Sequence, residues 1–232
     1  LRTPLTATAG WVRLLQSAKL STEQAARALD VIGRNVKTQT RIVDDLLDVS
    51  RMATGELKVH PIWCDASAVI EAATDAIRPA AVAKDIRVDM VVEPDVVKVF
   101  ADPERLQQIL WHVLANAVKF TGRWGQVALT CRRIGRDVEI AVSDNGEGIA
   151  PQFIPFVFDR FAQADASPRR EHGGQGLGLA IVRHLVTLHG GSASAHSDGK
   201  GLGTTITVRL PLPAAAQESS DRPDDTPIRW PA

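Results

Sequence analysis

The chain has 232 residues, of which 44% are hydrophobic and 23% charged, values ordinary for a globular protein of one large or two modest domains. Its 27 basic and 27 acidic residues give a formal net charge of zero, which provides no electrostatic footprint for nucleic acid or an anionic membrane. No apolar run approaches the roughly 20 residues of a membrane-spanning helix, so we expect no direct membrane contact by this segment. The expected location is cytoplasmic, and a membrane anchor of the parent protein could lie outside this sequence. The cysteines, Cys64 and Cys131, form no CxxC pair, which argues against a disulfide framework or a zinc site.

Residues 1–54 are predicted to form a helical hairpin. Its second helix, roughly Thr22 to Met52, carries apolar residues at alternating three- and four-residue steps. This seam consists of Leu29, Ile32, Val36, Val43 and Leu46, widened by Ile42 and Leu47 and interrupted at Gln39 and Ser50. Pro4 is expected to kink or break the first helix, because proline lacks an amide proton and crowds the preceding turn. One hairpin cannot bury such a seam, so we expect a homodimer in which two hairpins form a four-helix bundle.

Residues 55–212 show a mixed α and β pattern and are predicted to form a second domain. The expected strands are Glu56–His60, Ile86–Val91, Val127–Arg133, Asp137–Ser143, Ser192–His196 and Thr204–Leu210. The expected helices are Ala66–Ala83, Pro103–Val118 and Leu177–Leu188. Because the elements do not alternate as βαβ, we expect an α+β fold, with an α/β two-layer sandwich and a mixed, mostly antiparallel sheet. Residues 213–232 are rich in proline and polar residues and are predicted to be a disordered tail or linker.

Four short segments carry the chemistry. They are LANAVKFT with Asn116, Lys119, Phe120 and Thr121; Asp144–Ile149, directly after a strand; Gly173–Leu179, which opens a helix; and Gly201–Thr205, which leads into the last strand. Each pattern alone is common in turns and loops. The four in this order and spacing are not expected by chance, and together they indicate a nucleotide site. The sequence has no GxxxxGK[ST] or GxGxxG fingerprint, which excludes P-loop and dinucleotide folds.

The residue types fit a nucleotide with its magnesium ion. The amide oxygen of Asn116 is a hard ligand suited to Mg²⁺, and Lys119, three residues later on the same helical face, can neutralise phosphate. Asp144 can accept from an exocyclic amine, which selects adenine over guanine. Glycine at positions 146 and 148 lets the backbone approach a flat base. Glycine at positions 176 and 178 exposes amides at a helix start to phosphate.

These segments resemble the N, G1, G2 and G3 boxes of the ATP-binding domain shared by histidine kinases, gyrase, mismatch-repair ATPases and a heat-shock chaperone. Residues 153–161 resemble the F box of the histidine kinases. Leu1–Leu5 resembles the tail of the phosphoacceptor motif His-Glu-Leu-Arg-Thr-Pro-Leu, and Asp44–Arg51 resembles the end of the second dimerisation helix. The resemblance covers residues 1–212.

The resemblance implies a protein-histidine kinase of a two-component system. ATP and Mg²⁺ would bind between the Pro103 helix and a lid at residues 162–174, and the γ-phosphate would pass to a histidine and then to an aspartate of a response-regulator receiver domain. That histidine would lie two residues before Leu1, so this chain is expected to bind ATP without autophosphorylating at the usual site. Thr3 matches the position that assists the reverse, phosphatase reaction. The implied nucleotide-binding residues are His112, Asn116, Lys119, Asp144, Gly146, Gly148, Ile149, Gly174, Gly176, Leu177, Gly178, Thr204 and Thr205.

Two alternatives remain open at this point. His112 stands one turn before Asn116, where histidine kinases usually have asparagine and gyrase-like ATPases a glutamate; it either bonds the phosphates or packs on its helix. The runner-up function is a nucleotide-binding dimerisation or scaffold module without kinase activity.

Overall fold

The structure is a computed structural model. It describes residues 2–17, 20–94, 96, 98–163 and 175–213, except for the side chains of residues 2–4. The chain divides into two compact units, Leu1–Leu57 and Lys58–Ala232. Gly174, most of the expected lid and the expected tail beyond residue 213 lie outside the described residues.

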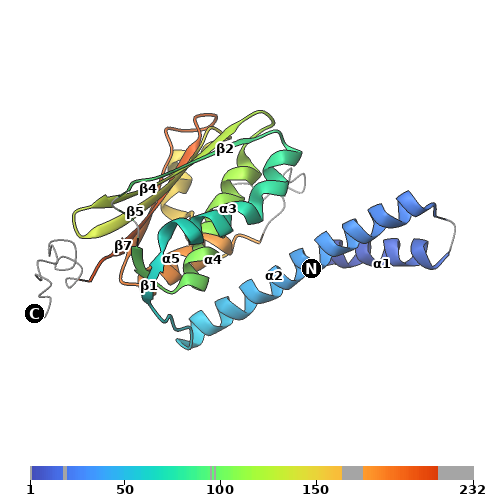
Figure 1. Cartoon of the computed structure of the whole chain (residues 1–232), viewed down its shortest axis with the longest axis horizontal. Helices are drawn as coiled ribbons and strands as arrows, with labels where there is room; N and C mark the ends of the chain where they lie inside the picture. Colours follow the sequence, from blue (N-terminus) through green and yellow to red (C-terminus); the bar gives the residue numbers. More distant parts are fainter. Residues whose placement is uncertain (1, 18–19, 95, 97, 164–174, 214–232) are drawn as a thin grey trace, which may run out of the picture. The chain divides into compact units, whose positions relative to one another are not determined.

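The first unit is a helical hairpin of α1 (Arg2–Gln16) and α2 (Thr22–Thr54), in which α1 lies along the N-terminal part of α2 (Figure 1). Ser21 begins α2 with a capping box, because its hydroxyl accepts from the Gln24 amide and its own amide donates to the Gln24 side chain. Gly55 ends the helix in the left-handed conformation, with φ 71°. The expected break at Pro4 is wrong: α1 is continuous from Arg2 to Gln16.

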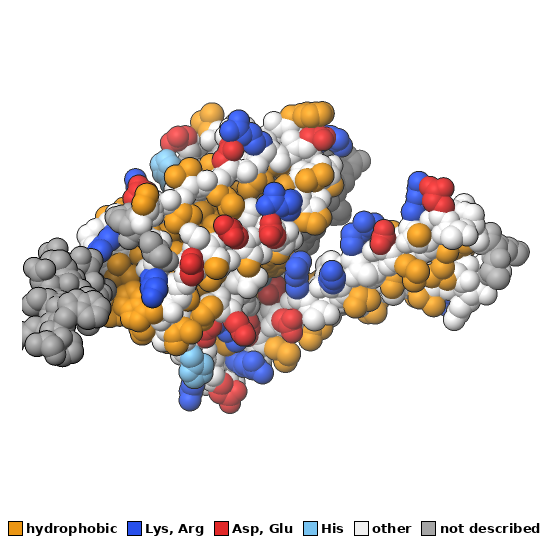
Figure 2. Space-filling view, in the orientation of Figure 1, with side chains coloured by type: hydrophobic (Ala, Val, Ile, Leu, Met, Phe, Trp, Pro, Cys, Tyr) orange, Lys and Arg blue, Asp and Glu red, His pale blue; other side chains and the backbone are white. Residues whose placement is uncertain are grey.

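The hairpin leaves apolar side chains uncovered, and Figure 2 shows hydrophobic side chains along its visible face. Leu29 is 61% exposed and Leu47 is 50% exposed. The other large apolar side chains exposed on the hairpin are Leu5, Val12, Leu14, Val36, Val43 and Leu46. A single hairpin therefore does not bury the seam that the sequence predicts.

The second unit is built on a five-stranded sheet in the order β2-β4-β5-β7-β6. The strands are β2 (Arg87–Val92), β4 (Gln126–Ile134), β5 (Asp137–Asp144), β6 (Ser192–His196) and β7 (Thr204–Pro211). The β2–β4 pair is parallel and the other pairs are antiparallel, which confirms the expected mixed, mostly antiparallel sheet.

Helices α3 (Ala66–Ala83), α4 (Pro103–Phe120) and α5 (Gly178–Leu188) cover one face of this sheet and complete the two-layer sandwich (Figure 1). The α3 bounds are those predicted. The largest fully buried side chains come from both layers and include Ile70, Leu106, Ile109, Leu110, Leu114, Leu129, Ile140, Ile181 and Leu185. Burial of these side chains provides most of the free energy that holds α4 and α5 against the sheet.

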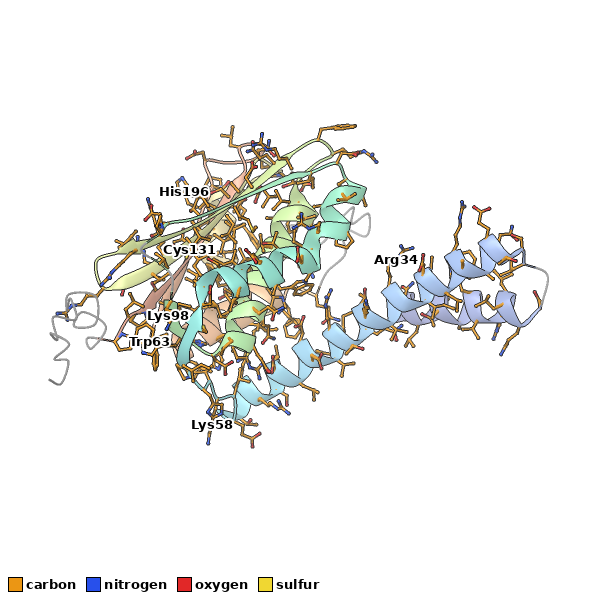
Figure 3. The ribbon with its side chains drawn as sticks, viewed as in Figure 1. Arg34, Lys58, Trp63, Lys98, Cys131 and His196 are labelled. Carbon is orange, nitrogen blue, oxygen red and sulfur yellow. The ribbon has the colours of Figure 1, made fainter. Side chains whose placement is uncertain are left out.

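The expected strand at Glu56–His60 is wrong. The amides of Glu56 and Leu57 donate to the carbonyl of Arg51 at 2.9 and 3.3 Å, so these residues complete the end of α2. The strand in this region is β1 (Ile62–Asp65), which pairs with β3 (Lys98–Ala101) in a separate two-stranded sheet. Figure 3 shows Trp63 of β1 and Lys98 of β3 together there, away from Cys131 of the main sheet. Neither β3 nor the 3₁₀ helix η1 (Pro151–Phe156) was predicted from the sequence.

The sheet face opposite the helices carries a buried carboxylate. Glu139 in β5 is 3% exposed and lies directly between Arg132 of β4 and Arg209 of β7. Both guanidiniums bond its carboxylate, with contacts of 2.7 to 2.9 Å. Burial raises the pKa of Glu139, but the two arginines outweigh burial and hold its pKa below the ordinary value. The three central strands are thus joined by side chains as well as by the backbone ladder.

Candidate functional site

The C-terminal turns of α4 carry the first two candidate residues. Asn116 and Lys119 are both half-buried. Burial lowers the pKa of the Lys119 ammonium, and the nearby Glu147 carboxylate partly opposes that shift. Nζ of Lys119 lies 4.4 Å from the centre of the Phe120 ring. A partly desolvated ammonium interacts with an anion more strongly than one in bulk water.

A lysine from the neighbouring helix fixes the end of α4. Lys84 follows α3, and its ammonium donates to the carbonyls of Val118, Lys119 and Thr121 at 2.9, 2.7 and 2.9 Å. The hydroxyl of Thr121 also donates to the carbonyl of Ala117 at 2.7 Å. The last carbonyls of a helix have no intrahelical partner and carry partial negative charge, so an ammonium there is stabilising.

Asp144 ends β5, and its half-buried carboxylate accepts from the amide of Gly146 at 2.9 Å. Burial raises the pKa of Asp144, while the amides of Gly146 and Thr204 lower it less strongly. The ionised carboxylate is therefore kept at some cost to folding, which is common for binding and catalytic groups.

The loop after Asp144 contacts the end of α4. The Glu147 amide donates to the carbonyl of Phe120 at 3.1 Å. Gly146 packs so closely on that carbonyl that a Cβ at this position would collide with it. The structure thus brings the Asp144 loop together with the α4 turns that carry Asn116 and Lys119.

The loop before β7 lies on the other side of the Asp144 loop. The amide of Gly201 donates to the carbonyl of Glu147 at 2.6 Å, and the amide of Gly203 donates to the carbonyl of Gly146 at 3.2 Å. Gly203 has φ 74°, and a Cβ there would collide with the carbonyl of Asp144. Only glycine combines this conformation with such an approach.

The two threonines that follow face opposite ways. Thr204 pairs with Asp144 across the β5–β7 ladder and lies on the same side of the sheet. Thr205 lies on the side opposite the helices, where its hydroxyl bonds that of Ser143 at 2.8 Å. The structure therefore brings Thr204 to the other site residues but does not bring the Thr205 side chain to them.

The third candidate segment opens α5. Gly176, with φ 68°, accepts from the amide of Phe161 at 2.8 Å, which ties this turn to the end of the expected F box. Leu177 is 2% exposed and precedes the helix without a side-chain cap on its first amides. Exposed amides at a helix start form an anion site when a ligand supplies the negative charge.

His112 lies under the start of α5. Its side chain is 5% exposed, and its ring is 5.0 Å from the ring of Trp111 in an edge-on arrangement. A Cβ on Gly178 would stand 2.9 Å from Nδ1 of His112. Of the two alternatives that the sequence leaves open, this geometry favours packing between α4 and the first turn of α5.

Sequence reasoning missed the residues that hold these segments in place. Lys84 and Ser197 lie outside the four motifs, and their contacts come from residues far apart in the chain. His189, after α5, accepts from the Asp102 amide at 3.0 Å through Nε2 and donates to the Leu185 carbonyl at 2.8 Å through Nδ1. Asp102 in turn caps α4 and accepts from the amide of His60. No local pattern marks Lys84, His189 or Ser197 for these roles.

None of the described helices is long and apolar enough to cross a membrane. Thr3 lies in α1, but its side chain is outside the described part of the chain.

Comparison with known proteins identifies the class. Residues 1–55 match the model of the His Kinase A (phospho-acceptor) domain, and residues 101–214 match that of the histidine kinase-, DNA gyrase B-, and HSP90-like ATPase. The solved mycobacterial sensor histidine kinase MprB is 31% identical to this chain, with a TM-score of 0.57 over 66% of this chain and 97% of that one. The chain belongs to the histidine kinase family.

Three longer proteins are also similar to this chain. Hybrid signal transduction histidine kinase D of Dictyostelium discoideum is 32% identical over 91% of this chain and 17% of the relative. Sensor histidine kinase RcsC of Escherichia coli K12 is 35% identical over 91% of this chain and 22% of the relative. Full-length ShkA, solved in complex with AMPPNP, is 31% identical, with a TM-score of 0.69 over 90% of this chain and 43% of that one. The chain thus spans less than a quarter of the two curated relatives.

Replacing Lys84 with methionine should destabilise the second unit. The change removes one ammonium from three helix-end carbonyls, and we expect the free energy of unfolding to fall by about 1–3 kcal/mol. Urea unfolding followed by circular dichroism measures this fall. Lys98→Met, at an exposed position of β3, is the control and should change stability by no more than about 0.5 kcal/mol. Equal stability of the two variants would contradict the capping role of Lys84.

Proposed function

We propose that this chain is the nucleotide-binding and dimerisation core of a protein-histidine kinase, which takes the γ-phosphate of Mg-ATP for transfer to a histidine and then to an aspartate of a response-regulator receiver domain. The observation that carries the proposal is the convergence of Asn116 and Lys119 with the Asp144 loop at one end of α4. Family membership, and the AMPPNP in the ShkA structure, support ATP as the nucleotide.

The described residues suit the two ends of ATP. Asp144 would accept the adenine amine, because its carboxylate is half-buried and already oriented by the Gly146 amide. Lys119 and the amides at the start of α5, with Gly176 and Gly178, would hold the phosphates. Asn116 is a fitting ligand for Mg²⁺, since amide oxygen is a hard donor. The ion, when bound, would neutralise charge on the phosphate oxygens.

Phosphoryl transfer depends mostly on positioning and charge neutralisation. Lys119 would supply charge neutralisation, because a bound phosphate offsets the desolvation that lowers the pKa of its ammonium. Lys84 and His189 would contribute to positioning indirectly, because they fix the two ends of α4.

The hairpin would supply dimerisation, and in the family it also carries the acceptor histidine. The seam on α2 has the periodicity of a bundle core, and its large apolar side chains are exposed in the single hairpin. We therefore propose that two copies pair through α1 and α2, and that Thr3 occupies the phosphatase-assisting position.

Loss of Asn116 should abolish phosphorylation. We expect a chain carrying His-Glu directly before Leu1 to show Mg²⁺-dependent, acid-labile labelling from γ-labelled ATP. Asn116→Ala should lower the labelling rate at least about 100-fold, because charge on the phosphates would no longer be neutralised in place. Gln107→Ala, an exposed amide on the same helix, should label normally. Labelling that survives Asn116→Ala would contradict the proposed site. ATP binding without labelling of the extended chain would favour the scaffold alternative.

Asp144→Asn should separate binding from stability. The asparagine oxygen can still accept from Gly146, but its NH₂ would face the adenine amine donor to donor. We expect ATP affinity to fall about 10- to 100-fold, corresponding to about 1.4–2.8 kcal/mol. Stability at neutral pH should be equal or higher, because burial raises the pKa of Asp144 and its ionisation opposes folding as pH rises through that pKa.

Ionisation of Asp144 is expected to favour ATP binding, although it opposes folding. ATP affinity of the unmodified chain should decline as pH falls toward the raised pKa of Asp144, since protonation removes the acceptor, and Asp144→Asn should lose this decline. Calorimetric titration at several pH values measures both effects. Asp137→Asn, at the other end of β5, is the control. A decline of the same size in Asp144→Asn would assign it to another group.

A charge in the seam should disrupt the dimer. Val43 is 46% exposed in the single hairpin, and Val43→Asp would place a buried carboxylate from each copy in the bundle. We expect the dissociation constant to rise at least about 30-fold, or about 2 kcal/mol. Sedimentation equilibrium measures this change, with Arg34→Asp, at an exposed outer position of α2, as the control. An unchanged dimer in Val43→Asp would exclude this seam as the interface.

A further inference from the structure

Ser197 is a buried hydroxyl between β6 and β7 that belongs to none of the four motifs. It is 7% exposed. Its Oγ donates to the carbonyl of Gly203 at 2.6 Å and accepts from the amides of Ile149 and Gly199 at 2.9 and 3.4 Å. A hydroxyl has one proton and two lone pairs, so its full hydrogen-bonding capacity is used within the protein.

These bonds join the two loops that border Asp144. Ile149 ends the loop that begins at Asp144, and Gly203 contacts the carbonyl of Asp144 itself. Gly148 packs so closely on the Gly199 carbonyl that a Cβ added to Gly148 would collide with that carbonyl. The same added Cβ would stand 3.1 Å from the Ser197 hydroxyl oxygen. The hydroxyl therefore lies beside one of the close contacts between the two loops.

Removing the hydroxyl would leave three backbone groups without this partner. The Ile149 amide and the Gly203 carbonyl lie in the same closely packed region, where an unmade hydrogen bond is costly. The loops can recover these bonds only by moving apart to admit water. Because Gly203 and Thr204 contact Asp144, such a movement displaces the carboxylate.

We propose that Ser197 is a positioning residue that holds the adenine end of the nucleotide site and thereby sets selectivity for adenine. This inference rests on the proposed function. The phosphate end of the site is built from α4 and the start of α5, and the hydrogen bonds of Ser197 all lie within the loops at residues 149 and 197–203. Ser197 therefore acts on the base through Asp144 and leaves the phosphate contacts in place.

The test compares Ser197→Ala with Val138→Ala, a buried truncation at the far end of β5 that controls for lost stability. Affinities for ATP, GTP and inorganic tripolyphosphate, each with Mg²⁺, are measured by competition against a fluorescent ATP analogue. We expect Ser197→Ala to weaken ATP about tenfold and to leave GTP and tripolyphosphate within about twofold, so the ATP-to-GTP preference collapses. Val138→Ala should keep the preference of the unmodified chain.

A second variant covers failure of Ser197→Ala to fold. Ser197→Cys keeps a side chain of similar size with only weak hydrogen bonding, and it should lose selectivity in the same direction by a smaller factor. An unchanged preference in a folded Ser197 variant overturns the inference. Equal losses for ATP and tripolyphosphate also overturn it, because the whole site would then depend on Ser197. If the unmodified chain binds no ATP, the proposed function itself fails, which is a different result.

Discussion

The close backbone approach around residues 144–149 is the constraint on which the rest of the site depends. This loop lies between the carbonyl of Phe120 and the loop that precedes β7, at separations that a Cβ would block. Glycine at positions 146, 148 and 203 is therefore required by packing, and not only by the turn. The approach places an acidic side chain, a helix end carrying an amide and an ammonium, and a strand start within one region.

Burial disfavours the charged forms of the two ionisable groups that suit a nucleotide. Burial shifts the pKa of Asp144 upward and the pKa of Lys119 downward, and both shifts oppose the charged form. Glu139, outside the site, shows the contrast, because two arginines hold it ionised despite burial. A carboxylate and an ammonium that remain incompletely paired are available to a ligand, and this availability is gained at the expense of stability.

Local signals in the sequence predicted much of the fold. The α3 bounds and the Pro103 start of α4 were predicted correctly, and the glycine positions located the loops. Local sequence patterns failed to predict elements and contacts that depend on residues far away in the chain. β3 is four residues long and exists through its pairing with β1. The amides of Glu56 and Leu57, which were predicted to begin a strand, bond a carbonyl at the end of α2 instead. Lys84 and Ser197 carry no local mark, because their acceptors and donors come from other parts of the chain.

The most direct measurement is hydrogen exchange, resolved by residue, on the chain with and without Mg-ATP. The central claim is that the Asp144 loop, the end of α4 and the loop before β7 form one hydrogen-bonded unit. We therefore expect the amides of Glu147, Ile149, Gly201 and Gly203 to exchange with one common opening free energy, and ATP to raise all four together. Independent exchange of Glu147 and Ile149 from Gly201 and Gly203, or protection by ATP of only one loop, would contradict the account.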